Sequence, residues 1–216
     1  AGVLIVWLYH LLHDEKDTGT NLVLSAIHSN ENIPLRMAPL IFIATLLTHL
    51  FGGSAGREGA ALQLGGSIGN SLGKLFHFDE KDQHIMIMCG MSAAFSAVFG
   101  TPMAAAVFAL EVVSVGVMYY AALLPCVIAS IIASKFAAGI GIHPELFHVT
   151  KIPELTIING LKMAVIAAAC GAISILFCVA LKAASTLYSK YLKNPYVRVV
   201  VAGIIVIGIT ILLNTK

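Results

Sequence analysis

Apolar and polar residues follow each other along the chain in blocks. Apolar segments are separated by polar joints that hold most of the charged residues. The apolar segments are 3–12, 38–51, 86–99, 102–117, 119–138, 163–181 and 197–213. The last two come closest to the roughly 20 residues that a helix needs to cross a membrane. We therefore predict an all-α protein that crosses a membrane several times, with residues 1–216 in a single membrane domain.

The composition agrees with a membrane setting. Hydrophobic residues make up 58% of the chain, charged residues only 11%, and the mean hydropathy is +0.91. A soluble domain needs more charge on its surface, whereas lipid solvates the outer face of a membrane domain. The net charge of +2 is too small to indicate a nucleic-acid partner. Because no nucleophile–base pair or metal-binding set stands out, we expect no catalysis, no cofactor and no bound metal.

Several apolar segments are shorter than an upright membrane span. In a bilayer, short helices are tilted, re-entrant or half-crossing, or they are buried inside protein. Channels and transporters contain such broken helices, which end near the middle of the membrane. A receptor-like bundle of uniform spans would give a different pattern. The chain therefore resembles a transport protein more than a receptor in its pattern of segments.

The segment 52–63 contains the residues best suited to binding an anion. A glycine-rich entry leads directly into a helix-forming sequence, and a helix N-terminus offers free N–H groups and about half a positive charge. Glycines let an ion approach the backbone closely, and Arg57 adds positive potential. We expect anion-binding residues at Gly56, Arg57, Gly59 and Ala60.

Glu58 lies within this segment and would place a carboxylate where a free anion would bind. The two anions would compete for the same N–H groups, so protonation or movement of Glu58 would open the site. Alternatively, Glu58 only stabilises the helix N-terminus, by about 0.3–1 kcal/mol. We favour a gate and proton carrier, because an ionisable residue between membrane-depth segments is a functional candidate by default. A nucleotide-phosphate loop is not indicated, since GxxxxGK[ST] and GxGxxG are absent.

Three further features concern structure. Gly65, Gly69 and Gly73 recur every four residues, which predicts a face for close helix packing. Pro102 follows a helix break and suits the first turn of a new helix. Glu111 lies alone in an apolar run, so we expect it to face a polar cavity or to be hydrogen-bonded within the protein.

Two adjacent stretches resemble the CLC family of chloride channels and proton-coupled anion antiporters: GREGAALQLGGSIGNSLGKLF and DEKDQHIMIMCGMSAAFSAVFGTPMAAAVFALEV. In that family a GREGP or GKEGP motif begins a half-helix, and its glutamate is the gate. The motif here runs from Gly56 to Ala60, with alanine in place of the usual proline. The resemblance extends from about residue 17 to the end and is strongest over 52–112.

The resemblance implies part of the CLC inverted-repeat helical fold. It also implies a homodimer, with part of the subunit interface in 102–138. Thr18 and Gly19 correspond to an anion-binding motif, GSGIP, that is degenerate in this chain. The inner proton-transfer glutamate of the antiporters corresponds to Val112. The second half of the fold and of the anion site would follow residue 216, so we expect 1–216 to be an incomplete domain.

The resemblance leaves three modes of transport open. A chloride channel is consistent with Val112, because channels of the family also lack the inner glutamate. A fluoride/proton antiporter is consistent with Val112 and with the degenerate first motif, whereas Val112 disfavours a chloride/proton exchanger. A membrane scaffold without transport would not need the Gly-Arg-Glu-Gly helix start. We expect an integral protein of the lipid bilayer, in the inner (plasma) membrane of a bacterium.

Overall fold

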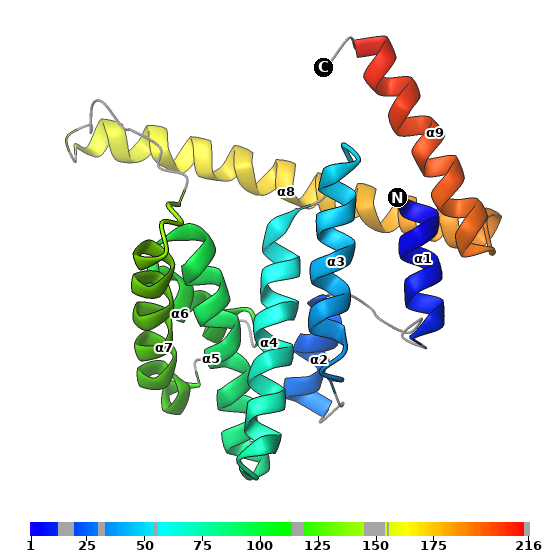
Figure 1. Cartoon of the computed structure of the whole chain (residues 1–216). Helices are drawn as coiled ribbons and strands as arrows, with labels where there is room; N and C mark the ends of the chain where they lie inside the picture. The colour runs from blue at the N-terminus through cyan, green and yellow to red at the C-terminus, as the bar shows by residue number, and fades with distance from the viewer. Residues whose placement is uncertain are drawn as a thin grey trace. The chain divides into compact units, whose positions relative to one another are not determined.

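The computed structural model describes residues 1–12, 20–29, 33–53, 56–113, 119–144, 154 and 156–213. The chain divides into two compact units, Ala1–Glu145 and Leu146–Lys216, and each is described by itself. Within these described ranges the regular structure is α-helical, without β-strands (Figure 1). The first unit contains α1 (Gly2–Leu11), α2 (Thr20–Ser29), α3 (Met37–Leu50), α4 (Arg57–Leu75), α5 (Glu80–Phe99), α6 (Pro102–Glu111) and α7 (Tyr120–Gly139). The second contains α8 (Ile157–Tyr191) and α9 (Pro195–Leu213).

Each predicted apolar segment contains a helix, although α5 and α8 are longer than predicted and α6 ends earlier, at Glu111. The apolar pattern does not predict α2, whose 10 residues mix apolar and polar side chains between two polar joints. It also misses the polar first turn of α5. There Asp79 is the N-cap, and its carboxylate accepts a hydrogen bond of 2.8 Å from the backbone N–H of Asp82. Such a cap stabilises a helix start without apolar residues, so α5 begins earlier than the hydrophobic segment.

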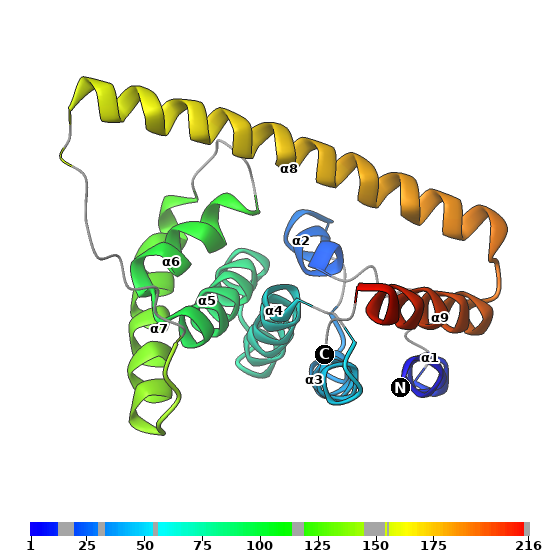
Figure 2. The same ribbon diagram turned by 90° about the horizontal axis from the view of Figure 1, so that it is seen from above.

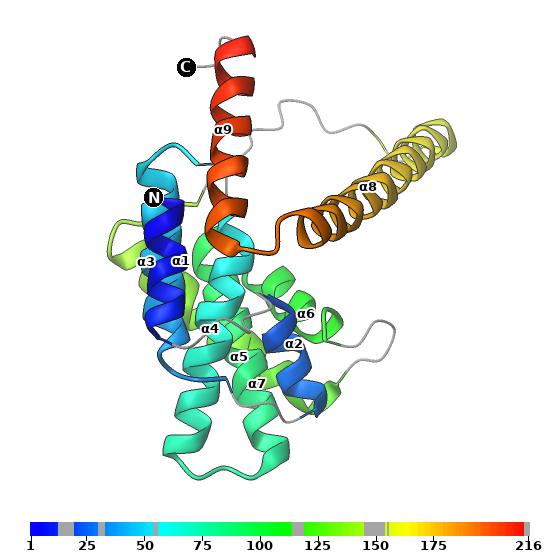
Figure 3. The same cartoon turned by 90° about the vertical axis from the view of Figure 1, so that its right-hand side faces the viewer.

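The α4–α5 hairpin is the centre of the first unit, and its two helices lie side by side (Figures 2 and 3). A Cβ atom added at Gly65 would collide with the carbonyl oxygen of Gly90, and one added at Gly90 would collide with that of Gly65. At Gly69 it would collide with the carbonyl of Met86. The predicted packing face is therefore confirmed: the two backbones touch where side chains are missing.

The core of the first unit lies where α2, α4, α5, α6 and α7 meet. Its buried residues include Val23, Leu62, Met88, Met91, Leu110 and Cys126. Serines join α5 to α7 beside this core: Ser92 donates to the carbonyl of Cys126 (3.0 Å) and Ser96 to that of Ser130 (2.8 Å). In the described residues, every buried polar side-chain atom has a hydrogen-bond partner, so the core contains no uncompensated polar group.

A second polar link holds the segment before α3 against α4. The Asn70 side-chain amide donates to the carbonyl of Ile33 (2.8 Å), while its oxygen accepts from the Gln83 amide (2.8 Å). Ser67 donates to the carbonyl of Pro34 (3.2 Å). These contacts fix the entry to α3 and connect it with both helices of the hairpin.

The second unit consists of two long apolar helices. The helix α8 has 35 residues, more than the predicted span 163–181, and begins with Thr156, whose hydroxyl accepts from the N–H of Asn159. The corner to α9 is held by the Arg198 guanidinium, which donates to the carbonyl of Leu192 (3.0 and 3.3 Å). At 1.5 Å per residue α8 is about 50 Å long, so it exceeds a hydrocarbon core of about 30 Å and must tilt or protrude.

Among the described residues, three helices, α7, α8 and α9, are long and apolar enough to cross a membrane, judged by length and composition. The shorter apolar helices α1, α3 and α6 have 10 to 17 residues. Pro102 occupies the first turn of α6, as predicted. This mixture of full-length and short apolar helices is the one expected of a transport protein.

The glycine contact between α4 and α5 can be tested by adding one methyl group. We expect Gly90→Ala to destabilise the intact protein by about 1–3 kcal/mol, because overpacking forces the backbones apart. The matched control is Gly171→Ala on α8, where the described residues leave the added Cβ in open space. Alanine improves helix propensity at both positions, so the control should be neutral or stabilising. Equal thermal unfolding midpoints of the two variants in detergent would contradict the contact.

Candidate anion-binding site

The helix α4 begins at Arg57, and no side chain caps its start. Its N-cap is Gly56, with extended backbone (φ −71°, ψ 144°) and no side chain to cap the first N–H groups. Upstream, α3 ends in a turn in which the N–H of Gly53 donates to the carbonyl of Thr48 (2.8 Å). A 19-residue helix that starts on glycine presents its N–H groups and its partial positive charge to an anion.

The carboxylate of Glu58 folds back toward this helix start. Its Oε2 atom lies 2.8 Å from the position that a Cβ atom on Gly56 would occupy. Glycine at 56 therefore leaves room for the carboxylate. Glu58 is exposed, so its side chain can move.

A pocket of about 340 Å³ opens beside Glu58. Its lining residues come from the start of α4, the end of α5, and the end of α7 with the residues that follow it: Arg57, Glu58, Ala97, Val98, Phe99, Ala137, Ile142 and His143. The charged or titratable groups among them are Arg57, Glu58 and His143. The helix start is thus part of a three-sided pocket in which polar groups face an apolar wall.

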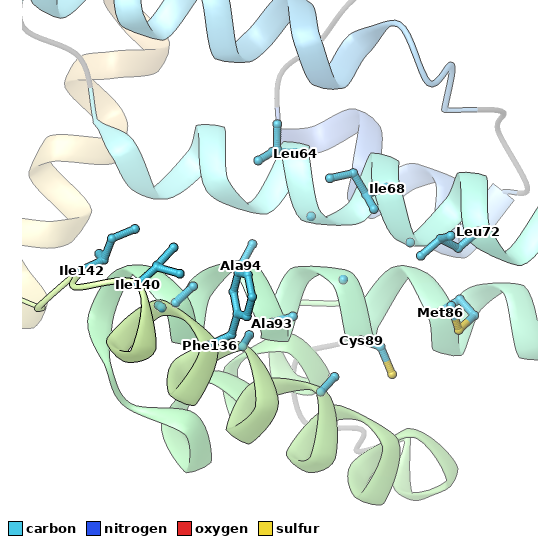
Figure 4. Close-up of a pocket in the computed structure, with 17 residues that line it drawn as sticks. Leu64, Ile68, Leu72, Met86, Cys89, Ala93, Ala94, Phe136, Ile140 and Ile142 are labelled. Atoms are coloured by element: carbon cyan, nitrogen blue, oxygen red, sulfur yellow. The ribbon is translucent and has the colours of Figure 1, made fainter.

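A larger groove of about 550 Å³ lies further along the hairpin (Figure 4). It is lined by side chains of α4, α5 and α7, among them Leu64, Ile68 and Phe136, and no charged residue belongs to its described lining. An unpaired ion would lose its hydration there without compensation. The groove therefore does not suit an anion, and the pocket at Glu58 does.

The sequence-predicted site residues fall into two groups. Gly56, Arg57, Glu58, Gly59 and Ala60 lie together at the start of α4. Thr18 and Gly19 lie outside the described residues. The described candidate residues thus all belong to the start of α4, and α5 and α7 supply the surroundings.

Two further residues bear on the site. Glu111 is the last residue of α6 and is exposed, and the polar cavity or internal hydrogen bond expected for it stays a prediction. The sequence analysis assigns no role to His143, but this residue lines the pocket of Glu58. The sequence Gly141-Ile142-His143-Pro144 gives one local indication of a turn before His143, because its glycine can end a helix.

Comparison with known proteins agrees with this arrangement. The profile of the family described as "Voltage gated chloride channel" matches residues 1–215. The chain belongs to this family. Its all-α fold is also that of a solved structure titled "Crystal structure of a CLC-type fluoride/proton antiporter", with a TM-score of 0.92 and 36% identity. The predicted fold class, part of the helical CLC membrane fold, is therefore confirmed.

Individual CLC relatives differ in similarity and in what they are named for. The "Chloride/fluoride channel protein" of Pseudomonas syringae pv. tomato is 40% identical over 169 residues, covering 78% of this chain and 37% of that protein. The "H(+)/Cl(-) exchange transporter ClcA" of Vibrio cholerae is 26% identical over 185 residues, covering 80% and 39%.

The CLC antiporter structure is matched over 99% of this chain and 54% of its own. The chain thus spans about half the length, or less, of the relatives it matches. Similarity over nearly the whole chain supports the fold of the described residues, while the activity of the whole protein belongs to the proposals below.

The room that Gly56 leaves for the Glu58 carboxylate is open to a direct test. We expect Gly56→Ala to displace the carboxylate and to shift the pH of half-maximal anion flux by about 0.4–2 units. This range converts a coupling energy of about 0.5–3 kcal/mol between two neighbouring residues into pH units. Flux is measured in liposomes over a pH series. The same change is then made in a Glu58→Gln background, where no carboxylate is left to displace. An equal shift in both backgrounds would show that Gly56 acts without Glu58.

Proposed function

We propose that the intact protein transports small monovalent anions across a membrane, with Glu58 as gate and proton carrier at the start of α4. The observation that carries the proposal is the position of the Glu58 carboxylate, folded back toward Gly56 at an uncapped helix N-terminus. Membership of a family described as voltage gated chloride channels supports transport as the activity.

The mechanism follows from competition between two anions. The first-turn N–H groups of α4 attract negative charge, and Gly56, Gly59 and Ala60 leave their surroundings open. The carboxylate of Glu58 is a tethered occupant of this region. Protonation removes its charge, and rotation removes it from the site, so either change admits a mobile anion. A single residue thereby controls access and binds a proton.

The remaining features of the working protein are proposed on the same basis. Thr18 and Gly19 would supply further anion contacts, and the second half of the site would come from the part of the fold that the longer relatives contain. Two such subunits would form a homodimer, with α6 and α7 contributing to the interface. Exposed apolar side chains on α7, such as Leu124, Ile128 and Ile132, suit either lipid or a second subunit. The inner membrane of a bacterium is the proposed location.

For the transported ion we propose fluoride first and chloride as the alternative. Two similar proteins, at 40% and 36% identity, carry fluoride in their names, one as a chloride/fluoride channel and one as a fluoride/proton antiporter. The chloride/proton exchanger is 26% identical. Val112 replaces the inner glutamate expected of chloride/proton exchangers. A proton-coupled antiporter and a channel both remain compatible with the gate.

The gate predicts how charge removal at Glu58 changes transport. We expect Glu58→Gln to abolish proton movement in a coupled antiporter, and to flatten the pH dependence of opening in a channel, because the proton-binding group is gone. Folding should change little, since Glu58 is exposed. Anion flux and proton flux are measured together over one pH series in liposomes.

Glu58→Ala is the companion variant, because it also clears the space of the side chain. If Glu58 only stabilises the helix, each variant would unfold more easily than the wild type, by about 0.3–1 kcal/mol. Intact coupling and an unchanged pH response would then show that Glu58 is not the gate.

The ion preference can be measured without a mutation. We expect efflux from liposomes loaded with fluoride to exceed efflux from liposomes loaded with chloride at equal concentration, recorded with ion-selective electrodes. Protein-free liposomes correct for leakage, including diffusion of HF. A chloride preference would overturn the fluoride assignment and leave anion transport in place.

A further inference from the structure

Two of the four cysteines of the chain lie against each other where α5 meets α7. Cys89 of α5 and Cys126 of α7 are free thiols, and their Sγ atoms lie 3.9 Å apart. The other two cysteines, Cys170 and Cys178, lie on α8. Eight helical residues separate their Cα atoms by about 12 Å along the axis, which is too far for a disulfide between them. Cys89 and Cys126 are therefore the pair of thiols that the fold brings together.

The register between α5 and α7 determines this contact. The carbonyl of Cys126 accepts a hydrogen bond of 3.0 Å from the hydroxyl of Ser92. One turn further along, the carbonyl of Ser130 accepts one of 2.8 Å from Ser96. In a helix the carbonyls point toward the C-terminus, whereas the side chains lean toward the N-terminus. The thiol of Cys126 therefore reaches back by one turn, from the level of Ser92 to that of Cys89.

The two thiols are close enough to form a bond with little movement of the helices. The sulfur atoms of a disulfide lie about 2.05 Å apart, and its Cα atoms lie within about 7 Å of each other. A serine side chain is short, so the hydrogen bond from Ser92 to a carbonyl of α7 requires the two backbones to lie close together. Rotation about the Cα–Cβ bonds of Cys89 and Cys126 then brings their sulfur atoms together, because cysteine can change between staggered rotamers.

The two thiols differ in their access to small molecules. Cys126 is fully buried, at 0% exposure. Cys89 is partly exposed and lines the apolar groove between α4, α5 and α7, where Figure 4 labels its side chain. A neutral oxidant such as hydrogen peroxide can enter an apolar groove without the large desolvation cost of an ion. Cys89 is therefore placed to meet the oxidant, and Cys126 is placed to react with the oxidised Cys89.

We propose that Cys89 and Cys126 are an oxidisable pair, which a hydroperoxide converts into a reversible disulfide between α5 and α7. The sulfur of Cys89, after loss of its proton, attacks one peroxide oxygen; the O–O bond breaks, and a sulfenic acid and water result. The sulfur of Cys126 then attacks the sulfenic sulfur, so the S–S bond forms and a second water leaves with the thiol proton. Two thiols and one hydrogen peroxide thus give one disulfide and two waters. A dithiol reductant reverses the reaction by thiol–disulfide exchange.

The disulfide joins two of the helices that line the Glu58 pocket. Ala97, in the wall of that pocket, follows Cys89 by about two turns of α5, and Ala137 follows Cys126 by about three turns of α7. Oxidation therefore ties together the two helices whose ends form this side of the pocket. The inference needs only the contact between the thiols and does not depend on the proposed role of Glu58.

The test compares cysteine by cysteine what oxidation does to the intact protein in detergent. The folded protein is treated with hydrogen peroxide, then unfolded and alkylated with N-ethylmaleimide, and peptide mass spectrometry reports each position. We expect alkylation to be lost at Cys89 and Cys126 together, with the two peptides linked and lighter by two hydrogen atoms. Dithiothreitol should restore alkylation at both positions.

The matched control combines Cys170→Ser with Cys178→Ser, which removes the exposed thiols that can form bonds between molecules. The linked peptides should appear in this variant as in the wild type. The order of reaction is tested by Cys126→Ser, in which the sulfenic acid of Cys89 has lost its partner and should be trapped by dimedone. Trapping on Cys126 in a Cys89→Ser variant instead would contradict the order.

Three results in the wild type would overturn the proposal, whether or not the serine variants fold. The first is full alkylation of Cys89 and Cys126 after oxidation of the folded protein. The second is linkage of either residue to a different cysteine. The third is equally rapid linkage when the peroxide is added after unfolding, because the folded contact would then have no part in the reaction.

Discussion

At the crossing of α4 and α5, Gly65 and Gly90 bring the two backbones into direct contact, and the place of the candidate site follows from it. The helices form a hairpin, so they run in opposite directions. Glu58 precedes Gly65 by about two turns, and Ala97 follows Gly90 by the same length. Each lies roughly 10 Å from the crossing along its helix. The positive end of α4 therefore lies beside the end of α5, whose last residues form the apolar wall of the pocket.

The serine hydrogen bonds between α5 and α7 determine that α7 also reaches the region beside the start of α4. Ser92 contacts Cys126 and Ser96 contacts Ser130, so the same spacing separates the partners on both helices. Such an arrangement requires α5 and α7 to run parallel. Their carboxyl ends consequently meet on the side where α4 begins. The partial negative charge of two helix ends favours cations there, which suits a pocket that contains Arg57 beside a carboxylate.

The sequence contained the local features of this site but only part of its surroundings. The helix start at Arg57, the glycine face and the first-turn proline of α6 each depend on neighbouring residues, so local rules predict them. The place of His143 depends on Pro144 contacting Gly100, 44 positions earlier in the chain, and no local pattern specifies that contact. The exposure of Glu111 likewise depends on where α6 ends. Thr18 and Gly19 lie outside the described residues, so their predicted role is untested.

The small binding energy of an anion at a helix N-terminus suits a transport site better than a site for tight binding. An anion at an exposed helix end gains about 0.3–1 kcal/mol, and Gly56 offers no side chain that would compete for the first N–H groups. The difference between a bound Glu58 carboxylate and a bound mobile anion is therefore small. A transported ion must bind well enough to enter and weakly enough to leave. Protonation of one carboxylate, at 1.36 kcal/mol per unit of pH, is sufficient to reverse so small a preference. The weakness of the helix-end interaction is thus what would allow Glu58 to act as the proposed gate.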